Sequence, residues 1–224
     1  MGTTASYDAT RARVEDYFDR TATRTWERLT SDAPVSRVRQ TVRAGRDRMR
    51  ALMLSRLPDD LSGVRVLDAG CGAGQMTAAL AARGADVTAV DISPQLIKVA
   101  RARLPSDTPG QVRFVAGDML GDLGEHDFVV AMDSLIYYSV PDIAAALDRL
   151  AERVRGGVVF TVAPRTPFLM AFWGMGKVFP QSDRSPVMVP HCHQRLSREV
   201  GGAVSKIDRV TSGFYISECL ELRP

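Results

Sequence analysis

The stretch VLDAGCGAGQ, residues 66–75, holds three glycines directly after a short apolar run that ends in Asp68. A strand that leads through a glycine turn into a helix can bind an anion or a nucleotide, because main-chain N–H groups point out of the helix and glycine lets a ligand approach the backbone. The dinucleotide pattern needs its third glycine at position 75, which is Gln. No Lys-Ser or Lys-Thr pair follows, so the pattern also excludes a phosphate-binding P-loop.

Two acidic residues near the turn narrow the choice of ligand. Asp68 stands directly before the glycines, where a carboxylate repels a pyrophosphate and suits a cationic ligand. Asp91 ends the next predicted strand, where its carboxylate can accept two hydrogen bonds from a ribose diol. The pair favours a positively charged nucleoside, with a nicotinamide-type site or a fold without cofactor as the alternatives.

The order of the predicted elements indicates an α/β fold. Predicted strands cover residues 64–68, 86–90, 112–115, 128–132 and 157–162, and 205–209 with 214–222 form a predicted hairpin. Predicted helices cover residues 10–30, 36–57, 75–83, 94–103 and 142–154. Strands that alternate with helices imply a parallel sheet with helices on both faces.

Three motifs, VLDAGCGAG, AVDIS (89–93) and AGDM (116–119), together resemble the S-adenosylmethionine (AdoMet) dependent methyltransferases of Rossmann type. The resemblance implies a mostly parallel sheet with an antiparallel strand in the C-terminal hairpin, and AdoMet as cofactor with S-adenosylhomocysteine (AdoHcy) as its product. The residues that it implies for cofactor binding are Arg43, Asp68, Gly70, Cys71, Gly72, Gly74, Asp91, Ile92, Gly117, Asp118, Met119 and Met132.

Three regions are expected along the chain. Residues 1–57 form a helical N-terminal arm or lid, and residues 58–224 form the Rossmann-like domain. Within that domain, residues 165–192 form an insertion on the substrate side, after the fifth strand. Residues 1–56 contain 12 Arg and 7 acidic residues, so the arm either carries a solvated charged face or attracts an anionic substrate, partner or membrane surface.

The whole chain resembles the magnesium-protoporphyrin IX O-methyltransferases of chlorophyll and bacteriochlorophyll synthesis in photosynthesis. Beyond the motif-bearing core, the matching segments are residues 14–29, 35–50, 133–138 and 214–222. The resemblance implies transfer of a methyl group to one propionate carboxylate of the magnesium porphyrin. It also implies a hand-over of that porphyrin from the porphyrin-carrying subunit of magnesium chelatase.

Two tyrosines are implied at the reacting centre. Tyr17 matches an arm tyrosine of the family, and Tyr137 stands where relatives have histidine. A tyrosine with a pKa of about 10 is no base near neutral pH, but a propionate with a pKa of about 4 is already ionised and needs none. Both tyrosines are therefore expected to orient the carboxylate or to pack against the macrocycle. The expected substrate-binding residues are Tyr138, Phe168, Phe172, Trp173 and His191.

Composition excludes several other classes. No apolar stretch of about 18 residues is present, and the N-terminus lacks the apolar segment of a secretory signal. Three cysteines indicate a reducing compartment, and a net charge of +3 is too small to indicate nucleic acid. The protein is expected in the cytoplasm, with a peripheral contact at the photosynthetic membrane left open.

Other interpretations of the chain remain open at this point. His191, Cys192 and His193 lack the spacing of a zinc site, so no metal is predicted, and a surface or helix-start histidine is an alternative for His191. The methyl acceptor could be another aromatic or isoprenoid molecule. A binding module that keeps AdoMet or a tetrapyrrole as a regulatory ligand predicts binding without turnover.

Overall fold

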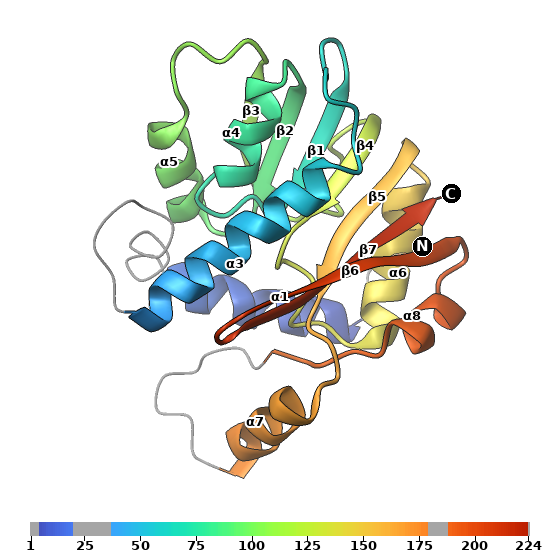
Figure 1. Cartoon of the computed structure of the whole chain (residues 1–224). Helices are drawn as coiled ribbons and strands as arrows, with labels where there is room; N and C mark the ends of the chain where they lie inside the picture. The colour runs from blue at the N-terminus through green and yellow to red at the C-terminus, as the bar shows by residue number, and fades with distance from the viewer. Residues whose placement is uncertain (1–4, 20–36, 179–187, 224) are drawn as a thin grey trace.

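A computed structural model of the 224-residue chain describes residues 5–19, 37–178 and 188–223. Its centre is a seven-stranded sheet with the strand order β3-β2-β1-β4-β5-β7-β6 (Figure 1). The strands are β1 (Arg65–Ala69), β2 (Asp86–Asp91), β3 (Val112–Ala116), β4 (His126–Ala131), β5 (Val154–Val162), β6 (Ala203–Ser212) and β7 (Tyr215–Arg223). Strands β1 to β5 pair in parallel, and β7 runs antiparallel between β5 and β6. The predicted α/β fold and the C-terminal hairpin are confirmed.

The helices begin where the local sequence favours a helix start. They are α1 (Ala5–Tyr17), α3 (Arg37–Leu54), α4 (Gln75–Ala82), α5 (Pro94–Arg103), α6 (Val140–Ala151), α7 (Pro167–Val178) and α8 (His193–Glu199). The hydroxyl of Ser93 accepts a hydrogen bond from the N–H of Leu96 at 3.3 Å, and Pro94 follows in the first turn. Ser139 caps α6 in the same way, so this helix begins two residues before the predicted start at Asp142.

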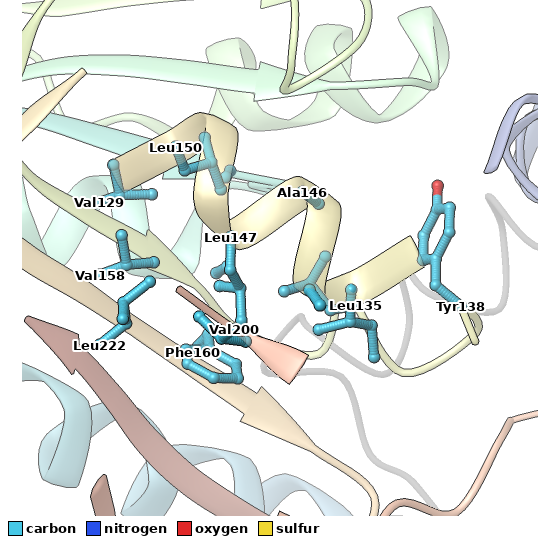
Figure 2. Packing of buried hydrophobic residues seen from close by; sticks show 14 of the residues in the cluster. Val129, Leu135, Tyr138, Ala146, Leu147, Leu150, Val158, Phe160, Val200 and Leu222 are labelled. Carbon is cyan, nitrogen blue, oxygen red and sulfur yellow. The ribbon is translucent and has the colours of Figure 1, made fainter. Parts of the chain in front are cut away.

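Helices cover both faces of the sheet, as predicted. On one face, α6 packs Leu147 and Leu150 toward Val129, Val158 and Leu222 of the strands (Figure 2). On the other face, α3 and α4 bury apolar side chains that include Met49, Met53 and Leu80, each with no exposed surface. Burial of this kind contributes about 25 cal/mol per Å² of apolar surface and holds the layers together.

The C-terminal hairpin lies directly against α3. A Cβ atom on Gly45 would lie 2.6 Å from Cδ1 of Tyr215, so a glycine is needed for the two backbones to approach. The hydroxyl of Ser212 donates to the carbonyl oxygen of Thr41 at 2.8 Å, and Arg56 forms an ion pair with Glu221 at 2.9 Å. Helix α3 is therefore packed on the sheet, and the division of the chain at residue 57 stays a prediction.

Parts of two predicted segments lie outside the described residues. Residues 20–30 of the helix predicted over 10–30, and residues 179–187 of the predicted insertion, belong to these parts. The described part of the insertion contains α7, which projects from the sheet beyond the end of β5 (Figure 1). Helix α1 begins at Ala5, five residues before the predicted start.

Candidate active site

A pocket opens at the carboxyl ends of the central strands, where parallel sheets of this kind bind their ligands. Its empty volume is about 960 Å³ with open solvent included. The segments that follow β1, β2, β3 and β4 form its floor, and α1 and α3 add side chains to its walls. Helix α1 supplies Tyr7, Arg11 and Val14, Phe18 follows directly after its end, and α3 supplies Arg46 and Arg50.

The glycine turn after β1 has a backbone that side chains rarely allow. Gly70, Gly72 and Gly74 have φ values of 83°, 54° and 85°, all in the left-handed region. A Cβ on Gly70 would lie 2.4 Å from Cβ of Ser134, whereas no described atom outside the chain neighbours lies within 4 Å of a Cβ on Gly72. The N–H groups of Gly70 and Cys71 both donate to the carbonyl of Val90 at 2.9 Å. The turn is therefore fixed to β2, and its bare peptide face at Gly72 is open to a ligand.

Asp91 connects the end of β2 to this turn. One carboxylate oxygen accepts from the N–H of Gly72 at 2.8 Å, and the other accepts from the N–H of Ser93 at 2.9 Å. Burial raises the pKa of Asp91 to about 6, and the two backbone hydrogen bonds oppose that rise. A carboxylate oxygen can accept more than one hydrogen bond, so Asp91 can hold the turn and still accept from a ribose diol.

Asp68 is a second buried carboxyl group in the pocket. Its Oδ2 atom accepts from the hydroxyl of Thr77 at 2.6 Å, and burial raises its pKa to about 7. A cation beside it would favour the charged form and offset the cost of burial. Two buried carboxyl groups beside an open glycine turn fit AdoMet, which carries positive charge on its sulfonium and ammonium groups, better than they fit a phosphate.

Asp118 occupies the side of the pocket after β3. Its Oδ1 atom accepts from the hydroxyl of Tyr7 at 2.8 Å and from the N–H of Leu120 at 3.0 Å, and Oδ2 pairs with Arg11 at 3.0 Å. Two of these three donors come from α1. The first helix is therefore joined to the segment expected to flank the adenine.

Two aromatic residues stand after β4, on the side expected for the methyl acceptor. Tyr137 contacts Phe18 edge to face with ring centroids 6.3 Å apart, and Tyr138 stacks on Tyr7 at 4.8 Å. Burial raises the pKa of Tyr137 above its ordinary value, and the nearby Asp133 adds to the rise. Tyr137 therefore stays protonated at neutral pH and can act as a hydrogen-bond donor but not as a base.

The structure brings most of the predicted site residues together. The pocket lining contains Asp68, Gly70, Cys71, Gly72, Asp91, Ile92, Gly117, Asp118, Met119, Met132, Tyr137 and Tyr138. Gly74 shapes the turn instead, since a Cβ there would lie 2.9 Å from Cβ of Ala100.

Besides Gly74, four predicted residues whose side chains the structure describes do not line the pocket. Arg43 lies on α3 about one turn before Arg46, which does line it. The ring of Tyr17 lies against Phe18 at 5.2 Å, and Phe18 takes the place at the pocket wall. Phe168, on α7, is 49% exposed and lies 6.1 Å from the ring of Phe214. The side chains of Phe172 and Trp173, also on α7, lie outside the described part of the structure.

His191 is the fourth residue, and its interpretation as a surface or helix-start histidine is wrong. It is 2% exposed, and α8 begins only at His193. Its N–H donates to the carbonyl of Ala163 at 2.7 Å, and its carbonyl accepts from the N–H of Arg165 at 3.0 Å. These bonds hold it beside the end of β5, where burial lowers its pKa to about 4.

We did not predict from the sequence that side chains of the first helix line the pocket. Tyr7, Arg11, Val14 and Phe18 follow one another at intervals of four, three and four residues, which is the spacing of one helix face. That spacing was a usable signal, but it mixes aromatic, basic and aliphatic residues. Arg46, Arg50, Asp133 and Ser134 also line the pocket, and although they lie in the family-matching segments 35–50 and 133–138, the sequence assigned them no role.

Known proteins place this chain in a family. Residues 66–157 match the family model for a methyltransferase domain, and residues 131–224 match the model for the magnesium-protoporphyrin IX methyltransferase C-terminus. The magnesium-protoporphyrin O-methyltransferase of Rhodobacter capsulatus is 63% identical over 222 residues, which cover 98% of this chain and 99% of the relative. The chain belongs to the magnesium-protoporphyrin O-methyltransferase family.

More distant members of this family agree with the assignment. The chloroplastic magnesium protoporphyrin IX methyltransferase of Arabidopsis thaliana is 29% identical over 94% of this chain and 70% of its own length. The crystal structure of magnesium protoporphyrin IX methyltransferase from Synechocystis PCC 6803 with bound SAH, another abbreviation for AdoHcy, matches with a TM-score of 0.80. It is 27% identical and covers 96% of this chain and 100% of its own.

Two further observations concern the described residues alone. None of their helices combines the length and hydrophobicity needed to cross a membrane. Nor do three or more His, Cys, Asp or Glu side chains converge anywhere among them as a metal site would require.

Proposed function

We propose that this protein transfers the methyl group of AdoMet to a propionate carboxylate of magnesium protoporphyrin IX and releases the monomethyl ester and AdoHcy. The observation that carries the proposal is the 63% identity to a magnesium-protoporphyrin O-methyltransferase over nearly the whole length of both chains. The pocket supports the proposal, because its lining combines the glycine turn, Asp68 and Asp91 with two tyrosines that follow β4.

The proposed cofactor contacts are those that the family resemblance implies, and the pocket lining contains the residues concerned. Asp91 accepts from the ribose, Asp68 stands near the ammonium group, and Asp118 with Met119 flanks the adenine. When bound, AdoMet supplies an electrophilic methyl group, and its transfer converts a carboxylate and a sulfonium into a neutral ester and a thioether with no proton moved. Because both starting charges disappear, a pocket that excludes water favours the transfer.

The side chains on the acceptor side position the carboxylate and need not remove a proton. Tyr137, kept neutral by burial, donates its hydroxyl to the carboxylate. Tyr17 supports this arrangement, since its ring contacts Phe18 and it lies close enough to Tyr137 to add to the rise in the pKa of that hydroxyl. Helix α1 acts as the lid, since Tyr7 and Arg11 hold it to Asp118 across the pocket. Closure of this kind excludes water from the reacting groups.

The hand-over of the porphyrin and the location of the protein are part of the same proposal. Phe168 and Phe214 are 49% and 58% exposed, lie next to each other and suit contact with an apolar partner. We propose that the porphyrin-carrying subunit of magnesium chelatase docks here, with the protein in the cytoplasm and peripheral to the photosynthetic membrane. Phe168→Ser combined with Phe214→Ser should weaken binding to that subunit without changing the affinity for AdoHcy.

A product assay tests the main proposal. The protein is incubated with radiolabelled AdoMet and magnesium protoporphyrin, and the labelled monomethyl ester is expected. No ester, together with no shift of the porphyrin absorption, would reject the proposal. Label transferred to a different aromatic or isoprenoid acceptor would establish the other enzyme class. Porphyrin or AdoMet binding with no turnover of any acceptor would indicate a regulatory module.

A further inference from the structure

A buried ion pair joins α3 to the segment after β4 inside the pocket. Nη1 of Arg46 lies 2.5 Å from Oδ2 of Asp133, and the two side chains are 16% and 8% exposed. Both residues line the pocket. Taking two charges out of water costs several kcal/mol per ion, and a buried pair often adds little net stability. The position of the pair is therefore better explained by the ligand than by folding.

Asp133 is held by groups other than Arg46. Its carboxylate accepts from the hydroxyl of Tyr215 at 3.1 and 3.3 Å and from the hydroxyl of Thr161 at 3.2 Å. Its own N–H donates to the oxygen of Thr161 at 2.8 Å. Among the described residues it is the one non-glycine with positive φ, at 56°, a conformation that concentrates at functional sites. Asp133 is thus a fixed anchor, and it sets where the guanidinium of Arg46 stands.

The nucleophile of the proposed reaction is itself a carboxylate, and the pocket already contains several acids. A further negative charge needs a cation nearby to offset its desolvation. Three cations line the described pocket, namely Arg11, Arg46 and Arg50. Arg11 pairs with Asp118, the carboxylate expected beside the adenine. Arg50 pairs with Asp47, whose side chain is 50% exposed, whereas Arg46 pairs with Asp133, which is 8% exposed and follows β4.

Arg46 is the cation on the acceptor side. It lies close enough to Tyr137 to oppose the rise in the pKa of that hydroxyl. We propose, on the basis of the function proposed above, that Arg46 binds the propionate carboxylate that receives the methyl group, while Asp133 holds the guanidinium in place. A guanidinium has five N–H donors in a rigid fork and can donate to two carboxylates at once. Asp133 also offsets part of its charge, so the substrate oxygen keeps its reactivity.

Binding measurements with two porphyrins test this role. Magnesium protoporphyrin IX has two free carboxylates, and its dimethyl ester has none. Binding of each to the protein saturated with AdoHcy, which cannot donate a methyl group, is followed by porphyrin fluorescence. Arg46→Gln is expected to weaken binding of the diacid by about ten- to hundredfold, since hydrogen bonds to charged groups are lost, and to leave binding of the dimethyl ester unchanged. Arg46→Lys is expected to recover part of the loss.

Arg48→Gln is the matched control, because Arg48 lies on the same helix and is exposed outside the pocket. It should bind both porphyrins as the unmodified protein does. Calorimetry with AdoHcy is the second control. An unchanged affinity for AdoHcy shows that a variant is folded and that its cofactor site is intact.

Three results would overturn the role of Arg46. The first is that Arg46→Gln loses the same affinity for the diacid and for the dimethyl ester. The second is that it binds the diacid as tightly as the unmodified protein does. The third is a loss of affinity for AdoHcy, which would assign Arg46 to the cofactor. Failure of the proposed function is seen separately. The unmodified protein would then form no ester from the diacid, whatever the variants do.

Discussion

The hydroxyl of Tyr7 donates a hydrogen bond to Asp118 at 2.8 Å and joins the first helix of the chain to the segment after β3. The ring of Tyr7 stacks on Tyr138, with the planes inclined by 22°. We expect Tyr7→Phe to lower the free energy of unfolding by about 1 kcal/mol, because the stacking stays and one hydrogen bond is lost. Urea denaturation followed by circular dichroism measures the change.

Tyr7→Ala serves as the comparison for this variant. It removes the ring as well as the hydroxyl and should destabilise the protein clearly more. A Tyr7→Phe protein as stable as the unmodified one would show that Arg11 and the N–H of Leu120 satisfy Asp118 by themselves.

Gly70 and Gly63 form a matched pair for testing the glycine turn. Both have left-handed φ, at 83° and 75°, but only a Cβ on Gly70 would meet a described neighbour, the Cβ of Ser134 at 2.4 Å. Alanine at either position carries backbone strain of about 1–2 kcal/mol. We expect Gly70→Ala to unfold more easily than Gly63→Ala and to lose at least about tenfold in AdoHcy affinity by calorimetry. Gly70→Ala with unchanged affinity would contradict the cofactor assignment.

The strand and helix pattern of the domain could be predicted because its signals are local. Ser93 and Pro94 mark the start of α5 by capping chemistry alone, and the glycine turn needs only residues that are adjacent in sequence. The start of α1 could not be predicted in this way. Two of its buried residues, Tyr7 and Val14, line the pocket, so their burial depends on segments far along the chain.

The same difference separates the two halves of the site. Asp68 and Asp91 stand at the ends of paired parallel strands, so the motif and the strand order place them together. Arg46 and Asp133 are 87 residues apart, and only the packing of α3 on the sheet brings them into contact. The burial of His191 could not be predicted for a related reason. Its backbone pairs with Pro164, just after β5, and no residue near His191 in the sequence indicates that pairing.

Asp91 should carry a measurable share of the cofactor affinity. We expect Asp91→Ala to weaken AdoHcy binding by about 1–3 kcal/mol, because a hydrogen bond to a charged group is lost and Gly72 loses its acceptor in the turn. Asp86→Ala is the control, since Asp86 is exposed at the opposite end of the same strand. Titration calorimetry that gives equal affinities for the two variants would argue against the ribose contact.

The raised pKa of Asp68, about 7, makes stability depend on pH in the ligand-free protein. In the unfolded chain this carboxyl titrates near 3.8, so between about pH 4 and about pH 7 the folded protein keeps a proton that the unfolded chain releases. The free energy of unfolding therefore falls as the pH rises through this window. Asp68→Asn removes the titrating group.

The stability of the unmodified protein relative to Asp68→Asn should consequently decline from about pH 4 to about pH 7 and then level off. Urea denaturation at a series of pH values measures this difference, in which other titrating groups cancel. Saturation with AdoHcy should move the decline to lower pH, since a cation beside Asp68 favours its charged form. A difference that stays constant with pH would mean that Asp68 is ionised throughout.

Helices α1 and α3 should differ in how easily they open. Helix α3 buries Met49 and Met53 with no exposed surface, whereas α1 has its buried residues over the pocket. Hydrogen exchange is slowest where burial is deepest, so without ligand the amides of α1 should exchange faster than those of α3. AdoHcy should slow exchange in α1 and change α3 little, because the ligand fills the space beneath the lid. Equal protection of both helices without ligand, measured by mass spectrometry, would contradict a lid made by α1.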